Sequence, residues 1–228
     1  MATFVLVPGA GGAAWTWHLL VPELELLGHD VTAVDIRGDD PSLGLPEYAE
    51  LVRAAIGGRR DVVLVAHSFG GFTAPMVAQD TSLRMIVLVN GMIPLPGETF
   101  GEWGGATGSE EARLQNAAAA GFGAEFDDAT YFLHDLDPEV AAAVEREDRE
   151  PAATPFGQPC DFERWPGIPI KVVAGSDDRL FPAAFQRRVA RERLGVEADE
   201  IAGGHLVALS NPVALARLLH TYAGQATG

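Results

Sequence analysis

The chain has 228 residues, 47% of them hydrophobic, and its formal net charge at pH 7 is −16. This length and apolar fraction predict a globular protein with one sizeable core that can carry an insertion. The acidic balance argues against nucleic acid and anionic membranes as partners.

Short apolar runs alternate with helix-like stretches along the chain. The predicted strands are 3–7, 31–36, 62–66, 85–89, 170–174 and a weak run at 196–201. The predicted helices are 15–27, 46–56, 72–78, 182–194 and 212–222. Continuous apolar strands between helices indicate an α/β fold, a three-layer sandwich whose sheet is mostly parallel and has about six strands. Ligands bind such sheets beyond the carboxyl ends of the strands.

The segment between Gly91 and Pro166 interrupts this alternation. It contains two helix-like stretches, 110–120 and 138–147, and several aromatic residues. It is also acidic, because residues 98–165 hold 16 Asp or Glu against 4 Arg. We expect residues 92–165 to form a helical cap over the ligand-binding edge, which supplies apolar walls to a pocket. The core would then comprise residues 1–91 and 166–228.

Ser68 follows the predicted strand 62–66, in the turn 66–70, which reads A-H-S-F-G and leads directly into a helix. This is the context of a nucleophile elbow, a sharp turn that presents a strained serine at its tip. Small neighbours allow the strand and the helix to approach closely, although Ala66 stands where the G-x-S-x-G pattern has glycine. A plain Ser-Gly turn is the alternative interpretation.

A serine hydroxyl is a weak nucleophile and needs a base that an acid orients. Asp177 and Asp178 follow the predicted strand 170–174, and His205 lies in a Gly-Gly-His loop before the last helix. The chain order serine, acid, histidine is the one found with nucleophile elbows. Because all these side chains follow strand ends, we expect them at one edge of the sheet.

These segments resemble the α/β-hydrolase fold, in the subgroup of plant methylesterases, hydroxynitrile lyases and bacterial pyrethroid-hydrolase-like esterases. The resemblance is carried by residues 6–17, 28–35, 66–71, 178–186 and 203–205. It implies a serine carboxylesterase that acts on a small apolar ester without a cofactor, while the oligomeric state, monomer or homodimer, stays open. Ser68 would be the nucleophile, His205 the base and Asp178 the acid. The backbone N–H groups of Ala10 and Phe69 would bind the oxyanion of the substrate.

Four other functions stay open. Lyases of this subgroup carry a lysine directly after the catalytic histidine, where this chain has Leu206. A carbon–carbon bond hydrolase or a non-catalytic small-molecule receptor of the same fold would keep the same residues. The glycine pattern 9–14, with Asp35 ending the second strand, also imitates a dinucleotide-binding loop. Against that reading, Trp15 and Trp17 would crowd the helix that must receive a pyrophosphate.

The single cysteine, Cys160, excludes an internal disulfide and is typical of a reducing cytoplasm, so we expect a cytoplasmic protein. No apolar run reaches the length of a membrane span, and no basic region precedes the first apolar run. No pair of histidines has metal-ligand spacing, so no metal site is expected.

Overall fold

In the computed structural model, which describes residues 1–225, the centre of the molecule is a six-stranded sheet in the order β2-β1-β3-β4-β5-β6. Every neighbouring pair of strands is parallel. The prediction of a mostly parallel sheet of about six strands is therefore confirmed. The strands are β1 (Thr3–Val7), β2 (Asp30–Ala33), β3 (Val62–His67), β4 (Leu83–Val89), β5 (Ile170–Gly175) and β6 (Ala198–Ile201).

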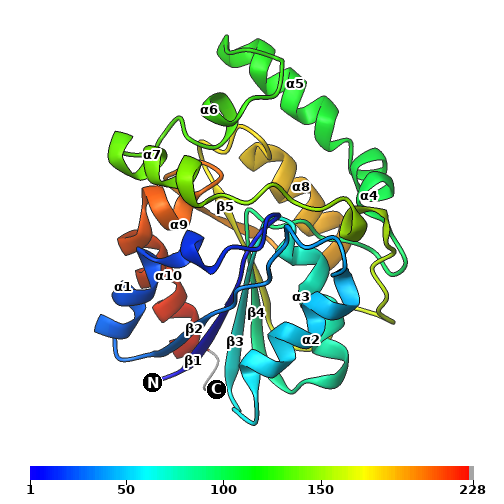
Figure 1. The fold of residues 1–228 in the computed structure, drawn as a ribbon, viewed down its shortest axis with the longest axis vertical. Helices are drawn as coiled ribbons and strands as arrows, with labels where there is room; N and C mark the ends of the chain where they lie inside the picture. Colours follow the sequence, from blue (N-terminus) through cyan, green and yellow to red (C-terminus); the bar gives the residue numbers. More distant parts are fainter. Residues whose placement is uncertain (226–228) are drawn as a thin grey trace.

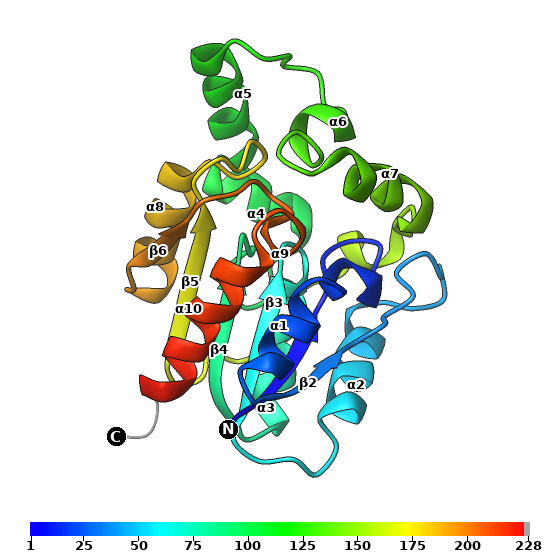
Figure 2. The ribbon, with the colours of Figure 1, turned by 90° about the vertical axis from the view of Figure 1, so that its left-hand side faces the viewer.

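Helices cover both faces of this sheet, which gives the predicted three layers (Figures 1 and 2). One face packs against α1 (Leu20–Leu26), α9 (Val207–Ser210) and α10 (Pro212–Gln225). The other face packs against α2 (Leu45–Ile56), α3 (Gly70–Asp80) and α8 (Ala183–Leu194). None of the helices within residues 1–225 is both long enough and apolar enough to span a membrane.

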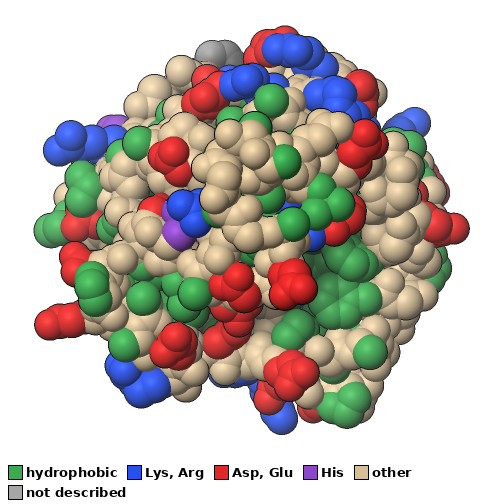
Figure 3. Space-filling view, turned by 90° about the horizontal axis from the view of Figure 1, so that it is seen from above, with side chains coloured by type: hydrophobic (Ala, Val, Ile, Leu, Met, Phe, Trp, Pro, Cys, Tyr) green, Lys and Arg blue, Asp and Glu red, His purple; other side chains and the backbone are tan. Residues whose placement is uncertain are grey.

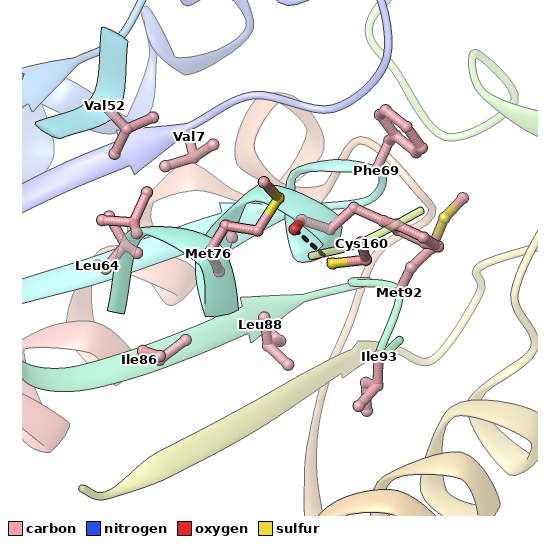
Figure 4. Packing of buried hydrophobic residues seen from close by; sticks show 14 of the residues in the cluster. Val7, Val52, Leu64, Phe69, Met76, Ile86, Leu88, Met92, Ile93 and Cys160 are labelled. Carbon is pink, nitrogen blue, oxygen red and sulfur yellow. Dashed lines mark hydrogen bonds between the residues drawn. The ribbon is translucent and has the colours of Figure 1, made fainter. Parts of the chain in front are cut away.

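The two faces explain the unbroken apolar runs of the strands. Successive side chains of a strand point to opposite faces, so a strand buried on both faces needs apolar residues throughout. In β3, Leu64 belongs to the core beneath α2 and α3, whereas Val63 and Val65 belong to the core beneath α1 and α10. Figure 4 shows part of the first core, to which Leu64 of the sheet and Met76 of α3 both belong.

The helices of residues 92–165, which we call the inserted segment, lie beyond the carboxyl edge of the sheet (Figure 1), and its last residues run back along α3, where Gln79 bonds to Glu163 and Arg164. Their elements are α4 (Phe100–Thr107), α5 (Ser109–Ala120), α6 (Asp128–Tyr131), α7 (Pro138–Glu147) and the 3₁₀ helix η2 (Thr154–Gly157). The predicted helices 110–120 and 138–147 correspond to α5 and α7. The division into a core of residues 1–91 and 166–228 and a cap of residues 92–165 stays a prediction.

Helix α4 is absent from the predicted helices because three of its eight residues are glycine. A reciprocal capping box starts it. The Thr99 hydroxyl oxygen accepts the N–H of Glu102 at 3.3 Å, and the Glu102 carboxylate accepts the N–H of Thr99 at 2.9 Å. Local hydrogen bonds at the first turn thus favour a helix that its composition does not predict.

Residues 149–152 of the inserted segment are tied to the loop that follows β2. The Ala152 N–H donates to the Gly38 carbonyl at 2.8 Å. Arg149 forms an ion pair with Asp35 at 3.0 Å. These contacts hold residues 149–152 over the carboxyl edge of the sheet, where the candidate functional residues gather.

Cys160 is buried in the core below α3, where its thiol donates to the Phe72 carbonyl at 3.0 Å (Figure 4). Burial raises the pKa of this thiol far above its ordinary value, since the thiolate would lose its hydration. The thiol therefore stays protonated and acts as a small core group with one hydrogen bond.

Candidate active site

Ser68 lies at the turn between β3 and α3 with a φ of 50°. A residue with a Cβ rarely adopts this left-handed conformation, so the turn must be held by its surroundings. The Ser68 N–H donates to the Val89 carbonyl at 3.3 Å. The Ser68 carbonyl accepts the N–H groups of Gly71 at 3.1 Å and Met92 at 3.0 Å. The sharp strand–turn–helix connection expected from the sequence is therefore present.

Glycines allow three backbone segments to meet at this turn. A Cβ at Gly70 would lie 2.6 Å from the Pro8 carbonyl oxygen, and a Cβ at Gly71 would overlap the Met92 carbonyl. A Cβ at Gly9 would lie 3.0 Å from the Cβ of Ser68. The loop after β1 therefore lies directly beside the serine, and the strand–helix approach leaves no room for side chains at 70 and 71.

His205 joins the serine to an aspartate through both of its ring nitrogens. Its Nε2 lies 3.0 Å from the Ser68 hydroxyl oxygen, and its Nδ1 lies 2.9 Å from Oδ2 of Asp178. Because an ionised carboxylate only accepts hydrogen bonds, Nδ1 carries the ring proton and Nε2 accepts the serine hydroxyl. All three side chains are buried. The structure thus brings together the three residues that the sequence placed after separate strands.

Of the two adjacent aspartates, Asp178 is the one that reaches His205. Its Oδ1 accepts the N–H groups of Leu180 and Phe181, both at 2.9 Å. These bonds orient the carboxylate so that Oδ2 faces the imidazole. Asp177 is exposed, and its carboxylate accepts the Ser176 hydroxyl at 3.1 Å.

Ala10 lies in the loop that follows β1, and Phe69 directly follows Ser68 in the turn. Phe69 directly precedes α3, so its N–H is one of those at a helix start that have no partner within the helix. Ala10 is exposed and follows Gly9, which contacts the serine. Within residues 1–225 neither N–H donates to a protein group. Both donors are therefore free to bind a ligand atom near the serine.

His67 supports His205 from the strand that carries the serine. Its Nε2 lies 2.9 Å from the His205 carbonyl and must donate to it, since a carbonyl can only accept. Burial, with a smaller effect of the nearby His205, lowers the pKa of His67 to about 3, so its ring stays neutral at physiological pH. No sequence signal announces this contact, because the partners are 138 positions apart.

Aromatic side chains of the inserted segment approach the site. The ring of Phe132 lies 5.2 Å from that of His205, and the ring of Phe156 lies 4.6 Å from that of Phe69. Other aromatics of the segment pack among themselves, as Phe126 does on Tyr131 at 5.4 Å. Two of the aromatic residues thus provide apolar walls beside the serine, while others stabilise the segment itself.

The loop that imitates a dinucleotide site is filled from within the protein. A Cβ at Gly11 would lie 2.6 Å from the Arg149 carbonyl oxygen. Asp35 pairs with Arg149 and accepts the Ala14 N–H at 3.1 Å. The element that follows is the short 3₁₀ helix η1 (Ala14–Trp17), not an α-helix that could receive a pyrophosphate. Residues 1–225 contain no group of three or more His, Cys, Asp or Glu side chains that could hold a metal ion.

A sheet of this strand order, with a serine at a left-handed turn after β3 and a histidine and an aspartate at the same edge, defines the α/β-hydrolase class. The chain belongs to the alpha/beta hydrolase family, whose model matches residues 4–218. The family and the fold predicted from the resemblance are therefore confirmed.

Two curated relatives and one solved structure illustrate the similarity. Norfluorocurarine synthase 1 from Strychnos is 39% identical over 97 residues, which cover 38% of this chain and 36% of the relative. Polyneuridine aldehyde esterase from Rauvolfia serpentina is 35% identical over 109 residues, 42% of this chain and 41% of the relative. These matches span about two fifths of the relatives' lengths. An extracellular α/β-hydrolase from a Paenibacillus species has a TM-score of 0.79 at 22% identity, covering 97% of this chain and 98% of its own.

Proposed function

We propose that the protein is a serine carboxylesterase that cleaves a small, mostly apolar ester through an acyl-enzyme. The observation that carries this proposal is the unbroken hydrogen-bond chain from Ser68 through His205 to Asp178 at a strained turn. A similar relative, from Rauvolfia serpentina, is named an esterase, which supports an ester as the substrate.

The geometry suits each step of acyl transfer. The Ser68 oxygen attacks the ester carbonyl while Nε2 of His205 takes the hydroxyl proton. Asp178 keeps the ring in the correct tautomer and stabilises the imidazolium that forms. His205 then gives its proton to the leaving alcohol, which departs and leaves the acyl group on the serine. A water molecule that His205 deprotonates attacks this acyl-enzyme, the bond to the Ser68 oxygen breaks, and His205 returns the proton to that oxygen as the acid leaves.

The oxyanion of each tetrahedral intermediate would be bound by the backbone N–H groups of Ala10 and Phe69. One such preorganised donor is worth about 3–4 kcal/mol of transition-state stabilisation in a well-studied protease. Neither donor requires a particular side chain, which is consistent with an alanine at one position and a core phenylalanine at the other.

The inserted segment would act as a cap that selects the substrate. Phe132 and Phe156 favour an apolar acyl or alcohol group beside the serine. Figure 3 shows acidic side chains scattered among apolar ones on the face above the sheet edge, in keeping with the net charge of −12 in residues 98–165.

Leu206, next to His205, offers no positive charge to a cyanide leaving group, which favours an esterase over a hydroxynitrile lyase. We also propose that the protein is cytoplasmic, because its single cysteine is typical of a reducing compartment.

A panel of p-nitrophenyl esters with acyl chains of increasing length tests the function, with Ser68→Ala as the control. We expect turnover of short and medium acyl chains by the wild type. The control should lose activity by a factor on the order of 10⁶, because the three residues act as a unit. Retention of a tenth of the wild-type activity by Ser68→Ala would rule out the proposed mechanism.

A further inference from the structure

Asn90 follows β4, is completely buried and has a φ of 46°. Its side-chain amide makes four hydrogen bonds. The nitrogen donates to the carbonyls of Gly204 and His205, both at 2.9 Å. The oxygen accepts the N–H of Gly175 at 2.7 Å and the side-chain amide of Gln186 at 3.1 Å. Both hydrogens and both lone pairs of the amide are therefore used.

Two of these partners, Gly204 and His205, belong to the loop that carries the base, and the other two, Gly175 of β5 and Gln186 of α8, lie on either side of the loop that carries the acid. Gly175 ends β5 three residues before Asp178, and the Gln186 amide also donates to Oδ2 of Asp178 at 3.2 Å. Gly204 directly precedes His205. The loops touch each other, because a Cβ at Gly175 would lie 2.7 Å from the Gly204 carbonyl oxygen. The Asn90 side chain, at the end of β4, bonds to both loops where they touch.

The His205 carbonyl is held by two donors. The Asn90 amide reaches it from the end of β4, and the neutral His67 ring reaches it from the end of β3, each at 2.9 Å. The backbone of the histidine is thus fixed to the two strands that flank the serine turn. Its ring can then bridge the serine and the acid without searching other orientations.

We propose that Asn90 is a positioning residue, which sets the register of the His205 loop so that the imidazole meets Ser68 and Asp178 together. This inference rests on the proposed function. Only an amide supplies two donors and two acceptors at this place, and asparagine tolerates a left-handed backbone better than most residues. A carboxylate would present an oxygen to two carbonyl oxygens and lose both donated bonds.

The test compares Asn90→Asp with Asn211→Asp. The Asn211 amide donates to the Ala202 carbonyl at 2.9 Å in the same loop but near the surface, so it controls for the chemical change. Titration with a phosphonate that labels the reactive serine gives the concentration of functional sites. The value of kcat is divided by that concentration, and KM is measured on the same samples. We expect kcat of Asn90→Asp to fall by about 10²-fold, as a misplacement of about 1 Å can cause, with KM within about twofold. The control should stay within about twofold of the wild type in both constants.

A second variant separates positioning from folding and from added charge. Asn90→Ser is smaller and uncharged, and a crystal structure should show His205 Nε2 beyond hydrogen-bond distance from the Ser68 oxygen. A normal kcat per labelled site in both variants, with only a lower melting temperature, would mean that Asn90 is merely structural. If the wild type neither hydrolyses esters nor reacts with the phosphonate, the proposed function fails. The crystal structure of Asn90→Ser then still decides the inference, since an unmoved His205 would overturn it.

Discussion

At the scale of single residues, the site depends on a histidine that is held at both its ring and its backbone. Asp178 receives two backbone N–H bonds on one oxygen, which leaves the other oxygen aimed at His205. The His67 ring stays neutral and donates a hydrogen bond to the backbone carbonyl of the same histidine. Each residue therefore has a distinct physical task that a substitution can separate.

Replacing Asp178 by asparagine should reduce kcat by about 10⁴-fold, because an amide can donate to Nδ1 and favour the wrong imidazole tautomer. Asp177→Asn is the matched control, since its carboxylate is exposed and points to Ser176. Its kcat should stay close to that of the wild type. Steady-state kinetics on a p-nitrophenyl ester measures both variants, and a greater loss at 177 than at 178 would reverse the assignment of the acid.

His67 should make folding sensitive to acid. Its pKa is about 3 in the folded protein and about 6.5 in the unfolded chain. Above about pH 6.5 neither state binds this proton. Between about pH 6.5 and pH 3 only the unfolded state binds it. As the pH falls through this range, the contribution of His67 lowers the free energy of unfolding by about 1.4 kcal/mol for each pH unit.

His67→Gln should therefore show a shallower loss of stability between about pH 6.5 and pH 4.5, measured by urea unfolding at a series of pH values. The glutamine amide can still donate to a carbonyl. His18→Gln, changed at an exposed position, controls for the loss of a histidine. Parallel stability curves for the wild type and His67→Gln would show that the buried ring does not resist protonation.

At the scale of secondary-structure elements, features set by neighbouring residues could be predicted from the sequence, whereas features set by long-range contacts could not. The run of apolar residues in β3, the small residues at the turn and the serine itself are adjacent in sequence, so this part of the site could be predicted. Asn90 could not, because its side-chain partners lie between 85 and 115 positions away and a lone asparagine after a strand has no distinctive pattern. Helix α4 could not be predicted either, for a local reason. Its three glycines disfavour a helix, and the capping box at Thr99 that starts it was recognised only in the structure.

The glycines of α3 and α4 should respond in opposite ways to alanine. Gly71→Ala should lower the free energy of unfolding by about 1–3 kcal/mol, because its Cβ would overlap the Met92 carbonyl beside the serine turn. Gly105→Ala should raise it by about 0.4–1 kcal/mol, since it lies inside α4 with no atom near the added methyl group. Urea unfolding measures both. Equal effects of the same sign would contradict the close approach at the turn.

At the scale of the whole molecule, the inserted segment carries most of the net negative charge and is proposed to control access to Ser68. Two of its aromatic residues contact the rings of His205 and Phe69 beside the serine, which is only 7% exposed. Residues 149–152 are tied to the core by the Arg149–Asp35 pair and the Ala152–Gly38 bond, and Cys160 is tied to it by the bond to the Phe72 carbonyl. In the proposed esterase, a substrate would pass an acidic and apolar surface before it reaches Ser68.

An anionic ester should be a poorer substrate than a neutral ester of equal size, and the difference should shrink as salt rises. The Debye length falls from about 30 Å at 0.01 M to about 3 Å at 1 M ionic strength, so added salt screens the acidic segment. The ratio of kcat/KM for p-nitrophenyl butyrate to that for p-nitrophenyl hemisuccinate, followed against salt concentration, measures this. A ratio that does not change with salt would assign the preference to contacts inside the pocket instead.

The identity of Ser68 as the nucleophile is tested most directly by reacting the protein with a fluorophosphonate and locating the adduct by peptide mass spectrometry. The account predicts one phosphonyl group per chain, on the Ser68 oxygen, with loss of esterase activity in proportion to labelling. An enzyme that still hydrolyses esters after complete labelling of Ser68, or an adduct on a different residue that alone abolishes activity, would contradict it.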